Sequence, residues 1–316
     1  MARKELGPAT LQIVQAVRSN TPDRPLLAAV SGGADSLALA FAVARICRER
    51  GQPGAGITVD HGLQSGSAGQ AERVLGQLRR LGFTDTELIT VDPAAGAGPE
   101  ADARSARYRA LDEAASTRQA EIVLGHTLDD QAETVLLGLA RGSGARSLSG
   151  MSSRPGRLRP LLGLRRSTTR ACCAELGLDV WDDPHNDDAR FTRSRVRQQV
   201  LPVLESELGP GIAESLARTA DLLRDDADLL DRLSEQLLGR ARRDDALDCA
   251  VLADAEPALL GRALKSWLDD HGAEQTPYAQ VQAVTSLINN WRGQRELHLP
   301  GLSVRRVDGR LIAERH

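Results

Sequence analysis

Short apolar runs alternate with longer amphipathic stretches along the first 141 residues. The apolar runs predict strands, at about residues 25–30, 57–59, 86–91 and 121–124. The amphipathic stretches predict helices, at about residues 7–19, from the turn after residue 30 to residue 49, and at 67–81, 100–116 and 129–141. In the first of these helices, Leu11, Val14 and Val17 share one face. The alternation is typical of an α/β fold in which helices cover both faces of a parallel sheet.

The pattern changes after residue 141. Residues 141–166 are rich in Gly, Ser, Pro and Arg and predict a loop, which a helix at 167–176 follows. Residues 181–188 are acidic and turn-like. The Arg-rich residues 190–197 then lead into a helix that we expect to break near Pro202.

From about residue 211 the periodicity predicts helices again, at 212–242, 256–270 and 277–290. Short alternating strands follow at 296–299, 302–307 and 311–313, joined by Pro-Gly and Asp-Gly turns. We therefore expect a catalytic domain over residues 1–188, an Arg-rich linker helix over 189–211 and a smaller, mainly helical domain over 212–316.

The turn after the first strand has the composition of an anion site. Its residues are Ser31, Gly32, Gly33, Ala34, Asp35 and Ser36. The two glycines permit a tight turn, and the start of a helix adds partial positive charge. Asp35 is an acid inside this cradle, which makes sense if Mg²⁺ lies between the carboxylate and the phosphates. The alternative is an ordinary turn, since the loop lacks both a Walker lysine and the three glycines of a dinucleotide fingerprint.

Polar residues also follow two other predicted strands. Asp60 and His61 follow the second strand, and His126 follows the fourth. Because ligands of parallel sheets bind beyond the carboxyl ends of the strands, these residues and the glycine turn should converge on one nucleotide site. A lone His can equally be structural.

Two pairs of charged residues have the i, i+3 spacing that shares a helix face. Asp130 and Glu133 could hold a cationic substrate such as an amine, or could merely favour the helix dipole. Arg104 and Arg107 could brace a phosphate or a developing negative charge, or form a solvated basic face. The Arg-rich segments 154–170 and 190–197 suit phosphodiester contacts, with solvated loops as the alternative.

Composition limits these readings. The 316-residue chain has a net charge of −3, so nucleic-acid binding would need a local basic patch. It contains no apolar run that could span a bilayer, and residues 1–6 lack a signal-peptide core, so we expect a cytoplasmic protein without a membrane partner. The four cysteines show no metal-binding spacing, and the adjacent Cys172 and Cys173 are expected in the core.

The ordered set of motifs resembles a known family. Residues 31–36 match the Ser-Gly-Gly-x-Asp-Ser signature of the N-type ATP pyrophosphatases, also called the PP-loop superfamily. Further stretches look like the tRNA(Ile)-lysidine synthases, in the compact form without an additional C-terminal domain. These are Val-Asp-His-Gly-Leu at 59–63, Ala-Arg-Ser-Ala-Arg-Tyr at 103–108, His-Thr-Leu-Asp-Asp-Gln-Ala-Glu-Thr at 126–134, Arg-Gly-Ser-Gly at 141–144 with Gly-Met at 150–151, Arg-Pro-Leu-Leu at 159–162, Asp-Pro-His-Asn at 183–186, Arg-Ser-Arg-Val-Arg at 193–197 and Leu-Pro at 201–202.

The resemblance implies an adenine nucleotide alpha hydrolase-like, Rossmann-like domain and a ligase that forms a C–N bond. Such enzymes join L-lysine to C2 of the wobble cytidine of tRNA(Ile) with a CAU anticodon, through an adenylated cytidine, and release pyrophosphate and AMP. The modification changes the codon read from AUG to AUA and the tRNA identity from Met to Ile. The implied substrates are ATP with Mg²⁺, lysine and this tRNA, and a homodimer is left open.

The same resemblance implies roles for individual residues. The loop residues Ser31 to Ser36, with Asp60, His61 and His126, would bind ATP, and Asp35 would also hold Mg²⁺. Asp130 and Glu133 would bind or orient lysine, and Arg104 or Arg107 would stabilise the leaving phosphate. Contacts with tRNA are expected from Arg159, Arg190, Arg193, Arg195 and Arg197.

Two positions depart from the family pattern. Gln64 stands where Arg is frequent, and Ser194 stands where Asn is frequent between the two arginines. Other readings are a tRNA thiolase of the same superfamily, an ammonia- or glutamine-dependent ligase, and a non-catalytic tRNA-binding protein. The missing Cys-x-x-Cys pairs disfavour the first, the Arg-rich stretch and trailing domain disfavour the second, and intact acids disfavour the third.

Overall fold

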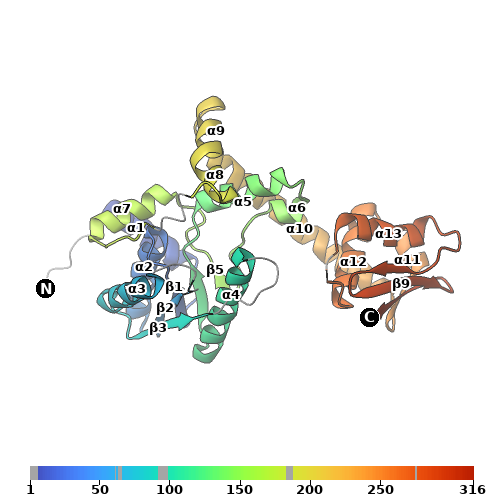
Figure 1. Ribbon diagram of the computed structural model, residues 1–316, viewed down its shortest axis with the longest axis horizontal. Helices are drawn as coiled ribbons and strands as arrows, with labels where there is room; N and C mark the ends of the chain where they lie inside the picture. Colours follow the sequence, from blue (N-terminus) through green and yellow to red (C-terminus); the bar gives the residue numbers. More distant parts are fainter. Residues whose placement is uncertain (1–5, 61, 63–65, 92–98, 183–187, 275) are drawn as a thin grey trace. The chain divides into compact units, whose positions relative to one another are not determined.

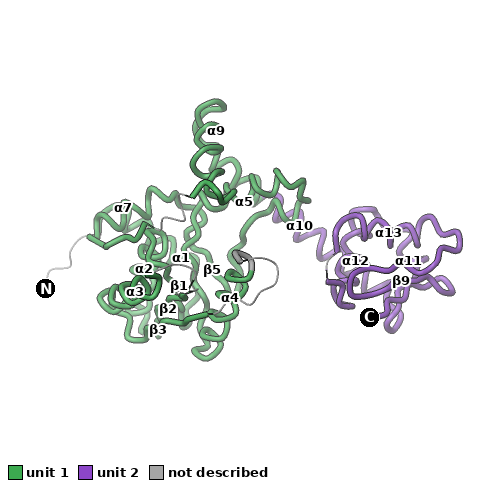
Figure 2. Tube along the Cα trace, in the orientation of Figure 1, with its two compact units in different colours: residues 1–221 green, residues 222–316 purple. Residues whose placement is uncertain are grey.

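The computed structural model describes residues 6–316 except 61, 63–65, 92–98, 183–187 and 275. The chain forms two compact units, residues 1–221 and 222–316 (Figure 2). The boundary falls within one helix, α10 (Ile212–Ala241), and the Arg-rich residues 189–211 belong by compactness to the first unit. Within the described residues, no helix is long and apolar enough to cross a membrane.

The first unit is built on a five-stranded parallel sheet with strand order β3-β2-β1-β4-β5 (Figure 1). This confirms the predicted α/β class. Its strands are β1 (Leu26–Ala29), β2 (Gly54–Asp60), β3 (Asp85–Thr90), β4 (Glu121–Leu124) and β5 (Arg157–Leu158). Its helices are α1 (Pro8–Ser19), α2 (Ala34–Arg50), α3 (Ser67–Leu81), α4 (Pro99–Arg118), α5 (Leu128–Ala140), α6 (Ala145–Leu148), α7 (Arg166–Leu176), α8 (Thr192–Arg195), α9 (Leu201–Glu207) and the start of α10.

Strand β1 shows why the apolar runs do not alternate with polar residues. Leu26 and Ala28 pack into the core beneath α1, α2, α3 and α7, whereas Leu27 and Ala29 pack into the core beneath α4. All four residues are at most 4% exposed, because helices cover both faces. The carboxyl ends of the strands then meet along one edge of the sheet.

Three expectations of local structure were wrong. Leu11 is 44% exposed, and Ile13 takes the inward position beside Val14 and Val17. The predicted loop at 141–166 contains α6 and the short strand β5, which pairs with β4. The helix before Pro202 does not break, since a π-helical turn at Val196–Val200 joins α8 to α9.

The π-helical turn follows from the chemistry of proline. Pro202 has no N–H for an α-helical bond, and its ring crowds the carbonyl of the preceding turn. A wider turn before Pro202 accommodates the ring while the helix continues to Glu207.

The second unit comprises the rest of α10, the helices α11 (Cys249–Ala253), α12 (Pro257–Asp270) and α13 (Tyr278–Asn289), and an antiparallel sheet. The sheet has the order β6-β7-β10-β9-β8. Its strands are β6 (Arg242–Arg243), β7 (Ala246–Asp248), β8 (Leu297–Leu299), β9 (Leu302–Val307) and β10 (Arg310–Arg315). The buried Trp267 lies in the core of this unit. The three tail strands were predicted, whereas the β6–β7 pair was not.

Gly125, at the end of β4, sets how closely the sheet approaches α2. A Cβ on Gly125 would lie 2.9 Å from the backbone oxygen of Asp35 and 3.1 Å from the backbone nitrogen of Ser36. We expect Gly125→Ala to push the start of α2 away and to lower the free energy of unfolding by about 1–3 kcal/mol. Denaturant unfolding checks this, with Gly76→Ala on α3 as the control, because a Cβ there meets nothing within 4 Å. Equal stability of the two variants would contradict the expectation.

Candidate active site

The glycine turn between β1 and α2 is closed by its own hydroxyl groups. The Ser36 hydroxyl donates to the Gly33 carbonyl at 2.9 Å and accepts from the Ser31 backbone N–H at 3.2 Å. Gly32 has a φ of +91°, which favours glycine, and a Cβ there would lie 2.8 Å from Val74. Gly33 is the N-cap of α2, so the loop delivers a helix N-terminus to the edge of the sheet.

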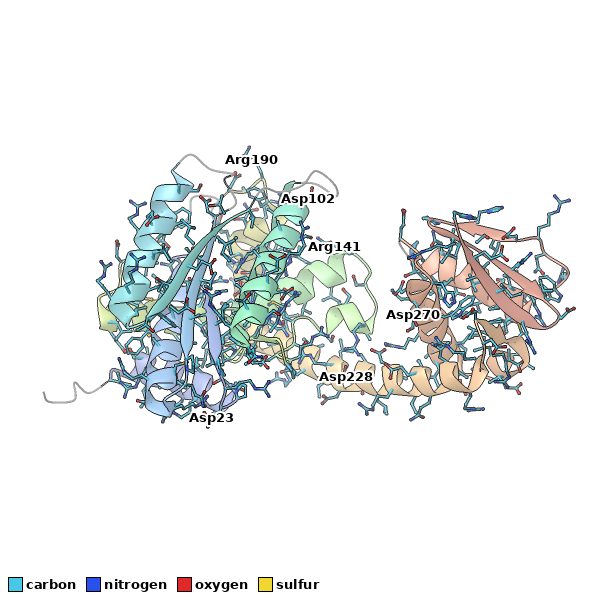
Figure 3. The ribbon with its side chains drawn as sticks, turned by 90° about the horizontal axis from the view of Figure 1, so that it is seen from below. Asp23, Asp102, Arg141, Arg190, Asp228 and Asp270 are labelled. Carbon is cyan, nitrogen blue, oxygen red and sulfur yellow. The ribbon has the colours of Figure 1, made fainter. Side chains whose placement is uncertain are left out.

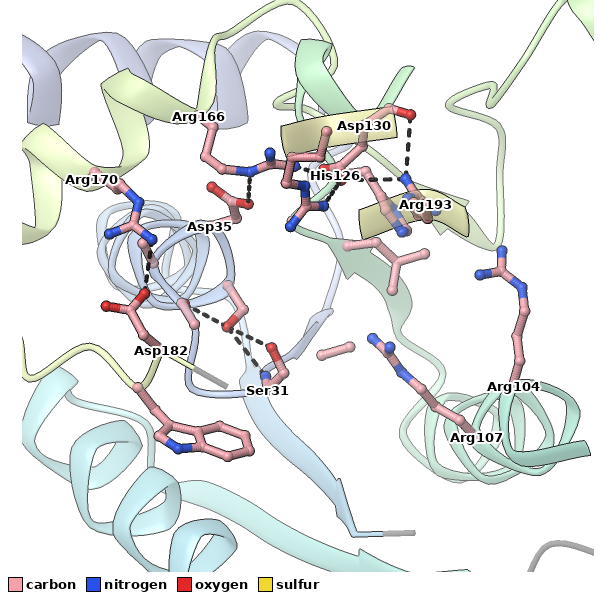
Figure 4. A pocket seen from close by; sticks show the side chains of 18 residues that line it. Ser31, Asp35, Arg104, Arg107, His126, Asp130, Arg166, Arg170, Asp182 and Arg193 are labelled. Atoms are coloured by element: carbon pink, nitrogen blue, oxygen red, sulfur yellow. Dashed lines mark hydrogen bonds and ion pairs between the residues drawn. The ribbon is translucent and has the colours of Figure 1, made fainter. Parts of the chain in front are cut away.

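A pocket of about 660 Å³ opens beside this loop (Figure 4). The predicted site residues that line it are Ser31, Gly33, Ala34, Asp35, Ser36, Arg104, Arg107, His126, Asp130, Arg193 and Arg197. Residues from four segments that are distant in sequence therefore meet. Two of these segments, at 31–36 and 126–130, follow strand ends and converge as expected. The other lining residues are Ala29, Leu124, Gly125, Arg166, Arg170, Trp181 and Asp182.

Three acids and three arginines form one network at the pocket wall, which we call the acid–arginine cluster. Its members are Asp35, Asp130, Glu133, Arg166, Arg193 and Arg197. Arg166 bridges all three acids, at 3.3 Å from Asp35, 2.8 Å from Asp130 and 3.3 Å from Glu133. The formal charges of the six side chains sum to zero.

Glu133 is the buried anchor of this cluster. Its side chain is 0% exposed, and Arg193 Nε and Arg197 Nε each donate to one of its oxygens at 2.7 Å. Glu133 therefore does not face the pocket, unlike Asp130. Two arginines expected to contact tRNA are thus held at the acids by Glu133.

Asp130 stays charged more readily than an ordinary aspartic acid, because its pKa is lowered. Burial by itself raises the pKa of Asp130. The positive charges of Arg166 and Arg193 lower it, and together with the hydrogen bond from Thr127 they outweigh burial, so the net shift is downward. One carboxylate oxygen also accepts from the backbone N–H of Thr127 at 2.8 Å, which closes a capping box at the start of α5. Asp130 consequently presents an ionised carboxylate to the pocket at neutral pH.

Asp35 has the opposite shift. Burial raises its pKa, although the Thr169 hydroxyl donates to one oxygen and Arg166 Nε lies 3.3 Å from the other. The ionised carboxylate therefore lacks full compensation from the protein. A cation that arrives with the substrate would supply it.

Arg107 and Arg104 project from α4 on the side of the pocket opposite Asp35 and Arg166 (Figure 4). Neither has an acidic partner among the described residues. Arg104 is exposed and lies 5.1 Å from the ring centre of Tyr108. Arg107 is less exposed, and burial lowers its pKa. An incompletely solvated guanidinium without a partner is suited to an anionic ligand.

His126 is neutral. Burial lowers its pKa to about 3, with Asp130 opposing the shift and Arg159 adding to it. Arg159 Nε lies 3.3 Å from His126 Nδ1, and since guanidinium only donates, the imidazole proton must be on Nε2. His126 can therefore donate one hydrogen bond inside the pocket, while Arg159 acts behind it rather than lining the pocket.

The remaining predicted residues that the structure describes do not line the pocket. Asp60 ends β2 and its carboxylate accepts from the Gly62 N–H at 2.9 Å, whereas His61 and Gln64 lie outside the described residues, as does the Asp-Pro-His-Asn motif. Gly32 lies against Val74 of α3 rather than in the pocket lining. Arg190 points outward, paired with Asp188 at 2.6 Å (Figure 3). Arg195 Nη1 donates to the Ala189 carbonyl at 2.7 Å, and Ser194 is buried.

Four charged or aromatic pocket residues were not singled out individually from the sequence, namely Arg166, Arg170, Trp181 and Asp182, although Arg166 and Arg170 lie in the Arg-rich segment 154–170. Arg166 begins α7, the helix after β5. Recognition of β5 as a strand would have placed Arg166 at the same edge as the other strand ends. Arg170 pairs with Asp182 at 2.8 Å, and the backbone N–H of Trp181 donates to the Gly32 carbonyl at 3.0 Å. No local pattern signalled these last contacts.

The site fits a magnesium ion that arrives with a nucleotide. Among the described residues, no three His, Cys, Asp or Glu side chains gather as a metal site. Mg²⁺, however, is commonly held by one or two carboxylates together with substrate phosphates and water. Asp35, a largely buried carboxylate beside the glycine turn, offers that arrangement.

Comparison with known proteins places this fold and site in a class. A model of the PP-loop domain matches residues 8–204, so the chain belongs to the PP-loop family of ATP-utilising proteins. A model of the TilS substrate binding domain matches residues 247–312. The chain is a member of the tRNA(Ile)-lysidine synthase family, whose enzymes are ligases that modify tRNA.

Relatives support this membership over nearly the whole chain. A tRNA(Ile)-lysidine synthase of Thermobifida fusca is 49% identical over 96% of this chain and 97% of its own length. One of Streptomyces coelicolor is 50% identical over 92% of this chain and 86% of its own length. The structure of a U34-tRNA thiolase of Methanococcus maripaludis with its 4Fe-4S cluster is similar with a TM-score of 0.58, covering 68% of this chain and 79% of that one. At 18% identity, this likeness concerns the fold alone.

Proposed function

We propose that this enzyme joins L-lysine to C2 of the wobble cytidine of tRNA(Ile) with a CAU anticodon, at the expense of ATP. The cytosine O2 attacks the α-phosphorus of ATP, and pyrophosphate leaves. The lysine ε-amine then attacks C2 of the adenylated base, and AMP leaves. One observation carries the proposal: a phosphate-type loop, an arginine with no acidic partner among the described residues and an ionised carboxylate line the same pocket.

The loop and the basic residues account for the first step. The α2 N-terminus and the Ser31 and Ser36 hydroxyls are placed to bind phosphate oxygens. Arg107, across the pocket, would stabilise the charge that develops on the reacting phosphate. His126 Nε2–H would donate a further hydrogen bond. Mg²⁺ bound with ATP would neutralise phosphate charge beside Asp35.

Asp130 accounts for selection of an amine in the second step. Its low pKa keeps the carboxylate ionised, as binding of an ammonium group requires. Glu133, expected to bind lysine as well, is assigned here to hold Arg193 and Arg197. Entry of an ammonium group at Asp130 would compete with Arg166 and Arg193, which would then be free to contact phosphate oxygens of the nucleotide or the RNA.

Transfer of labelled lysine to purified tRNA(Ile) with a CAU anticodon, with ATP and Mg²⁺, tests the function. We expect lysine incorporation with release of AMP and pyrophosphate. Conversion of ATP to AMP without lysine incorporation would keep the superfamily and overturn the substrate. In that case a thiolase or an ammonia-dependent ligase would replace the proposal.

The same lysine-transfer assay distinguishes the roles of Arg107 and Arg104. We expect Arg107→Ala to lower kcat for lysine transfer by about 10²–10³-fold, because it removes a desolvated donor to the transition state. Arg104→Ala, which removes an exposed side chain stacked near Tyr108, should cost less than about tenfold. Equal losses in the two variants would reject this division of roles.

We also propose which parts of the chain contact tRNA and how the enzyme occurs in the cell. The second unit contains the matched substrate-binding region, so we assign tRNA contacts to residues 212–316 together with the Arg-rich residues 189–211. Residues 1–188 are assigned to catalysis. Magnesium dependence, a cytoplasmic location and a homodimer are further expectations, which chelation, cell fractionation and size-exclusion chromatography with light scattering would check.

A further inference from the structure

A second hollow, of about 240 Å³, adjoins the phosphate loop on the side of α3. It is lined by Gln70, Arg73, Gln77, Asp179, Val180 and Trp181. Two contacts fix its walls: Gln77 Nε2 donates to the Asp179 carbonyl at 2.8 Å, and the backbone N–H of Trp181 donates to the Gly32 carbonyl at 3.0 Å. The hollow is smaller than typical drug-sized pockets, a size for one planar ring system rather than for a whole nucleotide.

Trp181 lines both this hollow and the active-site pocket. No aromatic ring or cation packs on its indole among the residues that the structure describes. Only 3% of the chain is aromatic, so an indole between two polar pockets is unusual for this protein. A flat, partly exposed indole beside a phosphate loop is a platform on which a nucleobase can stack.

Gln77 supplies an independent sign of a ligand. The residue is 5% exposed, yet its Oε1 accepts no hydrogen bond in the structure. The neighbouring Gln70 Oε1, by contrast, accepts from Arg73 Nε at 2.8 Å. A buried amide oxygen without a donor costs free energy, and a ligand N–H that entered the hollow would satisfy it after a small rotation of the amide.

We propose that this hollow binds a nucleobase with an exocyclic amino group, adenine or cytosine, stacked on Trp181 and donating to Gln77 Oε1. The assignment rests on the proposed function, which supplies both sources of such a base: the nucleotide itself and the RNA. A base held here would fix the position of its chain of phosphates relative to the loop at Gly32.

The fluorescence of Trp181 reports binding of a base in this hollow, and it can be measured on the whole 316-residue chain. The difference in emission between the native protein and Trp181→Phe isolates the signal of Trp181 from Trp267 and Trp291. We expect AMP to quench this signal, and IMP, which carries an oxygen in place of the amino group, to bind about tenfold more weakly. By isothermal calorimetry, Trp181→Ala should bind AMP about tenfold more weakly, whereas Trp181→Phe keeps a ring and should lose less.

Gln77→Met should abolish the preference for AMP over IMP without abolishing quenching. Gln280→Met is the matched control, because Gln280 also has a buried, partnerless Oε1 but lies on α13 in the other unit. Gln280→Met should prefer AMP over IMP to the same extent as the native protein. Thermal unfolding of each variant separates loss of the base contact from loss of the fold.

The source of the base is decided by two further titrations. If ATP saturates the quenching over the range in which it supports AMP formation, the adenine of the substrate occupies the hollow. If an RNA stem-loop with the CAU anticodon still quenches at saturating ATP, a base of the RNA occupies it. Absence of quenching by AMP, ATP and RNA, or a preference for AMP that survives Gln77→Met, overturns the proposal. Lysine transfer, assayed on the same preparations, reports separately on the proposed function.

Discussion

Asp35→Asn should abolish lysine transfer while leaving the protein at least as stable as the native form. We expect a loss of about 10²–10³-fold or more in kcat, because the neutral amide cannot balance a cation held with the phosphates. The fold should not suffer, since burial raises the pKa of Asp35 and the ionised form is therefore disfavoured in the native state. Transfer of labelled lysine and denaturant unfolding measure the two effects.

The sign of the pH dependence follows from the same shift. Because the pKa of Asp35 is higher folded than unfolded, its contribution to stability is fully present below the unfolded pKa and is lost as pH rises through the folded pKa. In Asp35→Asn this loss should disappear. Activity should show the reverse, falling as pH drops through the raised pKa. A variant that loses activity together with several kcal/mol of stability would contradict this account.

Glu133→Gln should have the largest effect on stability among the site variants. The amide keeps only one acceptor oxygen, so one of the two arginines that the carboxylate binds at 2.7 Å meets an N–H2 donor instead. The neutral side chain also no longer balances the charges of Arg193 and Arg197. Breaking a buried ion pair in this way typically costs about 3–5 kcal/mol. Denaturant unfolding, followed by the transition of the first unit, measures the loss. Glu113→Gln, on the exposed face of α4, is the control and should change stability by less than about 0.5 kcal/mol.

A double variant tests whether pairing is the cause. Adding Arg197→Gln to Glu133→Gln removes one of the orphaned charges, so the two changes should cost less together than the sum of the single variants. Strict additivity would mean that Glu133 stabilises the fold through something other than these contacts.

Much of the fold could be predicted because it depends on local patterns. The buried strands are continuous apolar runs, and the helix after the glycine turn begins at Ala34 as the loop chemistry required. The exceptions have physical causes. Strand β5 has two residues, too few for any periodicity, and Leu11 lies on a helix whose buried face is completed by small and polar residues such as Ala9 and Thr10.

The sequence predicts which residues line the site better than it predicts which of their side chains contact one another. Strand ends converge in any parallel sheet, which is why Ser31, His126 and Asp130 meet. Which guanidinium reaches which carboxylate depends on helix phase and on connections far apart in sequence. Arg166 lies 36 positions from Asp130, and no short-range rule could relate them. The partnerless Gln77 oxygen is likewise visible only once its neighbours are in place.

The internal neutrality of the acid–arginine cluster determines how the enzyme meets a polyanion. With a net charge of −3, the chain as a whole gives RNA no long-range attraction. The cluster adds none, since its charges cancel. Among the described residues that line the pocket, the charges that no neighbouring acid cancels are those of Arg104 and Arg107, and salt confines their field to about 8–10 Å. Electrostatics here should therefore orient an RNA that has already arrived rather than hasten its arrival.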